Sequence, residues 1–187
     1  MKLGYAICGS FCTIPRSLEV LRGLVGAGHT VVPIMSFNAA VTDTRFGKAE
    51  DIRKRVEEIC GRDIVDSIPA AEPLGPREPL DALLICPCTG NTLAKLACGI
   101  TDTPVTMAAK AHLRGDRPLV IALATNDAMS ANLRNIATML SRKNVYFVPL
   151  KQDDPLGKPH SLVADFGLTE ASLDAATGGQ QLRPLFM

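Results

Sequence analysis

The sequence predicts an α/β protein in which a doubly wound parallel sheet has helices on both faces. Short runs that are apolar throughout alternate with stretches whose apolar residues recur at helical spacing. Strands that are buried on both faces of a sheet read as such continuous apolar runs. The chain has 187 residues, 47% hydrophobic and 21% charged, which is typical of one globular domain with its own core.

The first part of the chain reads as strand, helix, strand. Residues 2–8 form an apolar run that stops at a Gly-Ser pair, as a buried strand does. Residues 15–26 place leucines at helical spacing, with proline at the start and glycine at the end. Residues 30–35 are rich in β-branched side chains, which predicts the second strand.

The next part contains one clear helix between loops. Residues 36–47 are polar and predict a loop. Residues 49–60 carry an apolar stripe at helical spacing and predict a helix that ends at Gly61. We expect a short strand over residues 63–68, and a loop over 69–79 because that segment holds four prolines.

The third part contains the strongest strand pattern. Residues 81–86 are almost entirely apolar and predict a buried strand. Helices are predicted over residues 89–98 and 104–113, the second with Thr103 as its cap. Residues 118–124 are apolar again and predict a further strand.

The last part is less regular. We expect a helix over 132–142, a last strand over 145–148, a loop over 149–160 and one more helix over 169–177. The sequence therefore predicts a single domain over residues 1–187, with a weakly patterned tail from about residue 150.

Charge and composition exclude several classes of protein. The 20 Lys and Arg residues balance 19 Asp and Glu residues, whereas nucleic-acid and anionic-membrane surfaces need clustered positive charge. No apolar run is long enough to span a bilayer. The first residues are broken by glycine and serine too early for a secretory signal. We expect a cytoplasmic protein.

The cysteines and histidines do not form a recognisable centre. The six cysteines include no CxxC pair, and the three histidines are scattered, so we expect free thiols and no metal site. Cys88 follows a strand and precedes a helix, where a thiol becomes more nucleophilic, but no histidine lies near it in sequence. No catalytic acid or base is identified.

The first two strands are followed by loops suited to a phosphate. In open parallel sheets, ligands bind outside the carboxyl ends of the strands. Gly9 permits close backbone approach, Ser10 offers a hydroxyl, and a helix start follows. A tight turn with a capping serine explains this loop about equally well. Ser36 begins the second loop, whose alternative is a plain polar loop.

The next two strand ends are richer in hydrogen-bonding groups. Residues 89–92 read Thr-Gly-Asn-Thr, a set that suits a planar polar heterocycle. Helix capping explains one of these residues but not all four. Thr125 and Asn126 end the following strand, and Asp127 either caps the next helix or contacts a ligand.

The stretch PCTGNTLAKLACGITDTP resembles the flavoprotein family of FMN-dependent cysteine decarboxylases and flavin prenyltransferases. Two motif elements carry this resemblance: Pro87, Thr89, Asn91 and Thr92 in the first, and Gly99, Ile100 and Asp102 in the second. The resemblance implies the Rossmann-like flavoprotein fold, bound FMN and a homo-oligomer built from trimers.

The resemblance and the loops together give a candidate flavin site. The phosphate is expected over Gly9, Ser10 and Ser36. The expected cofactor-binding residues are Gly9, Ser10, Phe11, Ser36, Pro87, Thr89, Gly90, Asn91, Thr92, Thr125 and Asn126.

Three departures separate this chain from the family's better-known activities. The decarboxylases carry a histidine before the third strand, where residues 74–80 have none. They also carry Pro-Ala-Met-Asn at the fourth loop, of which only Asn126 remains. The prenyltransferases hold a phosphate with an arginine where Ala124 stands.

The whole chain resembles one branch of the family, whose members are one of two components of a synthase that makes a pyridine dicarboxylate during sporulation. The resemblance implies an NAD(P)-dependent dehydrogenase-like component, the A subunit, as partner and a dicarboxylate substrate. Arg45 and Lys48 are the candidate substrate cations, although both also suit an ordinary solvated surface. The alternatives are a non-catalytic scaffold and a diverged FMN-dependent decarboxylase.

Overall fold

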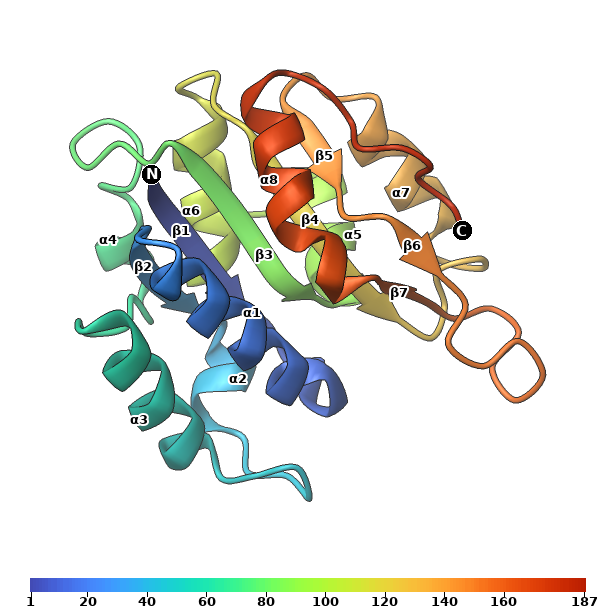
Figure 1. Ribbon diagram of the computed structural model, residues 1–187, viewed down its shortest axis with the longest axis horizontal. Helices are drawn as coiled ribbons and strands as arrows, with labels where there is room; N and C mark the ends of the chain where they lie inside the picture. The colour runs from blue at the N-terminus through green and yellow to red at the C-terminus, as the bar shows by residue number, and fades with distance from the viewer.

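A computed structural model describes all 187 residues and contains a seven-stranded sheet flanked by helices (Figure 1). Its strands run in the order β2-β1-β3-β4-β7-β6, with β5 also paired to β4. The central four are β1 (Lys2–Ile7), β2 (Thr30–Met35), β3 (Ala82–Cys88) and β4 (Leu119–Thr125), all parallel. This confirms the predicted fold class.

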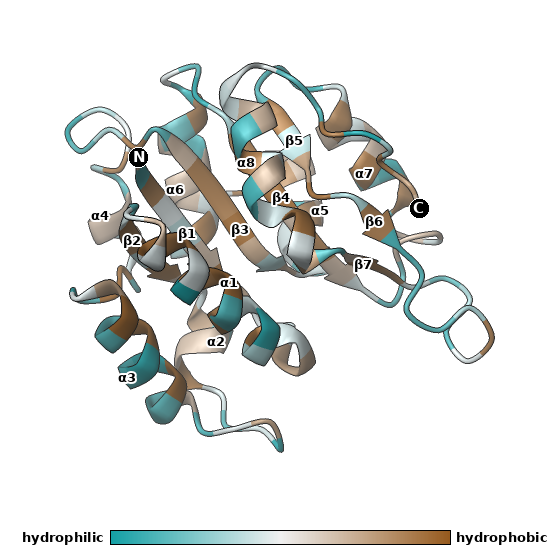
Figure 2. Cartoon of the chain, viewed as in Figure 1, coloured by the Kyte–Doolittle hydropathy of each residue, from teal (hydrophilic) through white to brown (hydrophobic).

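The central strands are buried, as their continuous apolar runs predicted. Every residue of β3 is buried, and β1 and β2 are buried from their second residue on. Figure 2 shows β3 as hydrophobic along most of its length. An apolar cluster of 51 buried residues runs through the sheet and its helices. We therefore propose that residues 1–187 form one domain.

Helices cover both faces of the sheet. In Figure 1, α1 (Ile14–Gly26) and α8 (Thr169–Thr177) lie in front of the sheet, and α3 (Ala49–Cys60) packs against α1 and β2. Behind the sheet lie α5 (Gly90–Cys98), α6 (Pro104–Leu113) and α7 (Leu133–Leu140). No helix is both long and apolar enough to cross a membrane.

The far edge of the sheet differs from the prediction. The segment predicted as a loop over 149–160 begins with strand β6 (Leu150–Lys151), and β7 (Leu162–Ala164) follows it. Both pair antiparallel, so the sheet is mixed and 145–148 is not the last strand. Strands of two and three residues are too short to show a period, which is why the sequence pattern missed them.

Strand β4 has two partners on one edge. The first half of β4 pairs with β5 (Val145–Phe147) in parallel, and Ala124 and Thr125 at its end pair with β7. The antiparallel addition therefore sits at the carboxyl end of β4, beside the residues that follow it.

Three smaller elements also differ from the prediction. The loop 36–47 contains helix α2 (Phe37–Val41), and α4 (Ile68–Ala71) begins the proline-rich segment. The expected strand over 63–68 is reduced to one bridge between Val65 and Ile34. Ser36 and Ser67 cap these short helices by accepting backbone hydrogen bonds, a local signal that the predictions did not use.

The C-terminal residues lie along β6. Leu150 N donates to Leu185 O at 2.7 Å, and Met187 N donates to Leu150 O at 2.9 Å. The Gln181 side chain binds both backbone groups of Phe147, at 2.7 and 2.8 Å. The tail is therefore part of the sheet's outer edge.

Candidate functional site

Two adjoining pockets lie at the carboxyl ends of β1, β3 and β4. The large pocket has a volume of about 630 Å³ and the small pocket about 390 Å³. Gly9, Phe11, Thr89 and Asn91 line both. The strand order reverses between β1 and β3, which is where open α/β sheets bind ligands and where flavodoxin-like folds hold FMN.

The β1 loop contributes a hydroxyl and close backbone. Thr13 Oγ1 donates to Ser10 O at 2.9 Å and to Ser10 Oγ at 3.0 Å, which fixes the turn into α1. A Cβ on Gly9 would lie 3.3 Å from the Phe11 ring, so any side chain here would press on that ring. Ser10 and Gly9 both line the large pocket, as the predicted phosphate loop requires.

The β2 loop reaches the small pocket. Ser36 is buried, and its hydroxyl accepts a hydrogen bond from Ala39 N at 3.3 Å. Phe37 and Asn38 stand beside it on the pocket wall. The capping role of Ser36 occupies one lone pair and leaves its own hydrogen for another acceptor.

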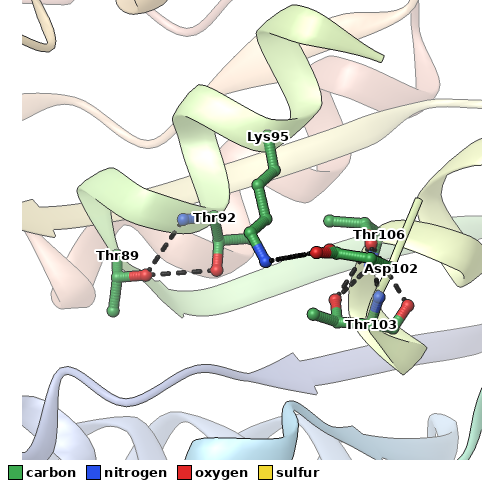
Figure 3. Close-up of polar contacts among 6 residues, drawn as sticks. All are labelled: Thr89, Thr92, Lys95, Asp102, Thr103 and Thr106. Atoms are coloured by element: carbon green, nitrogen blue, oxygen red, sulfur yellow. Dashed lines mark hydrogen bonds and ion pairs between the residues drawn. The ribbon is translucent and has the colours of Figure 1, made fainter. Parts of the chain in front are cut away.

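The β3 loop caps α5 through Thr89 (Figure 3), and it also connects to a buried thiol. Thr89 Oγ1 accepts from Thr92 N at 3.2 Å and donates to Thr92 Oγ1 at 3.1 Å. Thr92 Oγ1 in turn donates to Cys8 Sγ at 3.3 Å. Burial raises the pKa of the Cys8 thiol to about 11, so the thiol is neutral at pH 7. Both threonine hydroxyls are therefore held by the protein itself.

An ion pair forms one wall of the small pocket (Figure 3). Lys95 Nζ lies 2.8 and 2.9 Å from the two carboxylate oxygens of Asp102. Thr103 follows and forms a capping box with Thr106 at the start of α6. Lys95 and Thr103 were not among the expected site residues, because only the fold places the end of α5 beside the start of α6.

The β4 loop holds a carboxylate in a fixed orientation. Thr125 Oγ1 donates to Asp127 Oδ1 at 2.5 Å, and Asn132 Nδ2 lies 2.9 and 3.0 Å from the two carboxylate oxygens. Asn135 Nδ2 donates to Asn132 Oδ1 at 2.9 Å and orients that amide. The Thr125 hydrogen bond, supported by Asn132, lowers the pKa of Asp127 below its ordinary value, although partial burial opposes this.

Asp127 is not a helix cap. Helix α7 begins after Asn132, and no side-chain cap bond is made there. The capping alternative for Asp127 is therefore wrong, and the carboxylate lines the large pocket instead. Sequence reasoning left its role open because its partners Asn132 and Asn135 are set by the turn between β4 and α7.

Gly90 joins the two loops. A Cβ at this position would lie 2.5 Å from Asn132 Nδ2, 2.6 Å from Thr125 Oγ1 and 3.0 Å from Asp127 Oδ1. No real side chain fits these distances, so the start of α5 can approach the Asp127 network only with glycine at this position.

Two loops form the outer rim of the large pocket. Arg45 and Phe46 come from the segment after α2, with the guanidinium 4.9 Å from the Phe46 ring centroid. Asp153 and Lys158 come from the segment after β6 and form an ion pair of 3.2 Å. The rim is distant in sequence from the strand-end motifs, and Asp153 and Lys158 carried no recognisable signal.

The structure brings together most of the expected residues. All eleven expected cofactor residues except Pro87 line one or both pockets, as does Arg45. Pro87 is buried within β3, where its carbonyl accepts from Cys8 N at 3.1 Å. Lys48 is exposed at the start of α3 and lines neither pocket. The roles expected for these two residues stay predictions.

The pockets suit a flavin mononucleotide in size and in chemistry. Each falls within the ordinary range for small-molecule sites, about 300–1,000 Å³. Hydroxyls, backbone amides at a helix start and three exposed asparagines, Asn38, Asn91 and Asn126, line them. These are donors suited to a phosphate and a polar ring. At Gly90 the backbone of α5 lies close against the side chains of Thr125 and Asp127, which line the large pocket.

Comparison with known proteins gives a consistent result. A family model described as Flavoprotein matches residues 1–172. The B subunit of dipicolinate synthase from Bacillus subtilis (strain 168) is 42% identical over 186 residues, covering 100% of this chain and 93% of that protein.

Solved structures agree. The crystal structure of the dipicolinate synthase B subunit from Bacillus halodurans C has a TM-score of 0.91 and 40% identity, and covers 100% of this chain and 95% of that chain. The FMN-dependent cysteine decarboxylase SpaF has a TM-score of 0.70 and 25% identity, with 96% and 97% covered. The branch resemblance predicted from the sequence is confirmed.

Proposed function

This chain belongs to the flavoprotein family, and from that premise we propose that it is the FMN-binding B subunit of a dipicolinate synthase. The observation that supports this most directly is the cleft where the β1, β3 and β4 ends meet, in a chain that is similar over its full length to the B subunit of that synthase. The similarity thus supports a subunit that is associated with an enzyme. That this subunit itself takes part in an oxidation or reduction is our proposal.

The chain's own residues would bind and orient the cofactor. The Ser10 and Ser36 hydroxyls and the backbone at Gly9 would hold the phosphate, and residues 89–92 with Asn126 would line the ring. Bound FMN would supply hydride acceptance from a partly reduced pyridine ring. The protein would supply position and a partly enclosed cleft.

The partner and substrate complete the proposal. An NAD(P)-dependent A subunit would act together with this chain on a dihydro- or hydroxytetrahydro-dipicolinate precursor during sporulation. Arg45 on the rim of the large pocket is the candidate cation for a substrate carboxylate. We also propose a homo-oligomer built from trimers.

A spectroscopic titration tests the flavin assignment. The visible spectrum of the purified full chain is recorded before and after FMN is added, and binding is followed by quenching of flavin fluorescence. Asn91→Ala is expected to weaken binding at least tenfold, because this exposed amide lines both pockets. Gln180→Ala removes an exposed amide beyond the end of α8 and is expected to leave the affinity unchanged.

Two outcomes separate the proposal from its alternatives. Reduction of the bound flavin by dihydrodipicolinate under anaerobic conditions supports the oxidoreductase. If the full chain shows no binding of added FMN, the proposal is contradicted and the non-catalytic scaffold is favoured. A decarboxylase is the weaker alternative, because none of the chain's three histidines lines either pocket.

A further inference from the structure

We infer that Asp127 accepts a hydrogen bond from the ring nitrogen of the bound substrate, and that it thereby distinguishes the partly reduced ring from the aromatic product. This inference rests on the proposed function, because it takes a cyclic dicarboxylate as the substrate. It assigns to Asp127 a role in specificity, which concerns the large pocket and not the flavin phosphate.

The carboxylate has one acceptor position free for a ligand. Asp127 Oδ1 accepts two hydrogen bonds, from Thr125 and from Asn132, which fills both of its lone pairs. Oδ2 accepts one hydrogen bond, from Asn132 at 3.0 Å. Because Asp127 lines the large pocket and its carboxylate is held by Thr125 and Asn132, we take the remaining lone pair of Oδ2 as the acceptor for a ligand in that pocket.

The charges around this pocket match a ligand with two kinds of group. Arg45 has no carboxylate partner within the chain, and Lys158 is shared with Asp153 on the exposed rim. These cations suit the carboxylates of a ligand, whereas Asp127 suits a hydrogen-bond donor. A ring that carries two carboxylates and an N–H bears both groups at once.

The two states of the ring differ in what they offer to Asp127. A partly reduced ring in its enamine or protonated-imine form carries a hydrogen on nitrogen. The aromatic pyridine nitrogen carries a lone pair and no hydrogen at neutral pH. A carboxylate facing that lone pair brings two acceptors together, which is unfavourable. Asp127 would therefore retain the substrate and favour release of the product.

Three stable dicarboxylates test this difference on the full chain. Piperidine-2,6-dicarboxylate carries N–H bonds on a protonated amine, like the protonated-imine form of the substrate, whereas pyridine-2,6-dicarboxylate carries a lone pair. Benzene-1,3-dicarboxylate has an uncharged C–H in the same place and therefore tests the lone pair without a change in the charge of the ring. Wild-type protein is expected to bind the piperidine ligand at least tenfold more tightly than the pyridine ligand. Among the two planar ligands, it is expected to prefer the benzene one. Calorimetry with and without FMN measures these ratios.

Variants separate ring recognition from carboxylate binding. Asp127→Asn offers an amide that donates to a pyridine nitrogen, so the piperidine-to-pyridine ratio is expected to fall at least tenfold. Arg45→Ala is expected to weaken all three ligands together and to leave the ratio unchanged. Thermal unfolding of each variant establishes that it is folded.

The outcomes are distinguishable from failure of the proposed function. Equal wild-type affinities for the pyridine and piperidine ligands overturn the inference without any variant, and so does a lack of binding by all three ligands. A loss of FMN affinity in Asp127→Asn with an unchanged ratio would assign Asp127 to the N–H of the flavin ring, which also overturns it. FMN binding in the wild type is measured separately and tests the proposed function alone.

Discussion

The β3–α5 loop and the β4–α7 loop contain similar side chains but direct them differently. In the first, the Thr89 and Thr92 hydroxyls bind the helix start and the buried Cys8, so the start of α5 faces the cleft. In the second, Thr125 and Asn132 converge on the Asp127 carboxylate. One wall of the cleft is therefore electropositive and the other electronegative. The residue types at a strand end do not reveal whether the loop presents positive or negative electrostatic potential to the cleft.

Replacement of Gly90 by alanine should force the β3–α5 loop and the β4–α7 loop apart. The added Cβ would overlap Asn132 and Thr125 at 2.5–2.6 Å, and overpacking typically costs about 1–3 kcal/mol. We expect this loss in urea unfolding, together with at least tenfold weaker FMN binding. Gly23→Ala in α1 meets nothing within 4 Å and should raise stability by about 0.5–1 kcal/mol. Equal effects of the two substitutions would contradict the close approach.

Asp127→Asn should remove the negative wall. Loss of charge-assisted hydrogen bonds at this partly exposed site is expected to cost about 1–2 kcal/mol at pH 7. The folded-state pKa of Asp127 is lowered, so its contribution is complete above the unfolded-state pKa near 3.8 and is lost as the pH falls through the folded-state value.

Urea unfolding from pH 7 to pH 3 measures this dependence. The difference between wild type and Asp127→Asn should stay constant above about pH 5 and narrow below pH 4. The matched control is Asp174→Asn on the exposed side of α8, which has no ion pair and should show no such narrowing. If the difference in unfolding free energy between wild type and Asp127→Asn grew as the pH fell, the lowered pKa assigned to Asp127 would be contradicted.

Thr89→Ala should weaken the positive wall by freeing the start of α5. Loss of an N-cap costs about 1 kcal/mol, and Thr89 Oγ1 is the acceptor for Thr92 N. Thr89→Ser keeps that acceptor and should restore most of the stability. If serine and alanine behave alike in thermal unfolding, the cap is not what holds this loop.

Asp102→Asn should have the smallest effect. The Lys95–Asp102 pair is partly exposed, with 24% and 55% of the side-chain surfaces accessible, and such pairs contribute about 0–1 kcal/mol. A double-mutant cycle with Lys95→Met measures the coupling. A coupling well above 1 kcal/mol would show that the small pocket excludes water more than its exposure indicates.

The sequence predicted the parts of this fold that depend on local pattern. The four central strands and the helices between them follow from apolar runs and stripes. The β6 and β7 strands do not, because β7 pairs with β4 and β6 pairs with β7, and these pairings join residues that are not neighbours in the chain. Likewise the strand-end motifs predicted where a site would form, whereas Lys95, Asp153 and Lys158 reach it by packing. Lys48 lines neither pocket, because it lies at the start of α3, after the loop that reaches the large pocket, and its role in substrate binding stays a prediction.

The C-terminal tail has a consequence for how the protein is handled in solution. Leu185 and Met187 occupy backbone groups of Leu150, and Pro184 beside them has no N–H to offer outward. Residues 182–187 therefore shield a sheet edge that would otherwise be open to another chain. Their removal should expose this edge, and we expect the shortened protein to aggregate edge to edge, beyond its normal assembly, as its concentration rises. A purification tag is accordingly better placed at the other end of the chain.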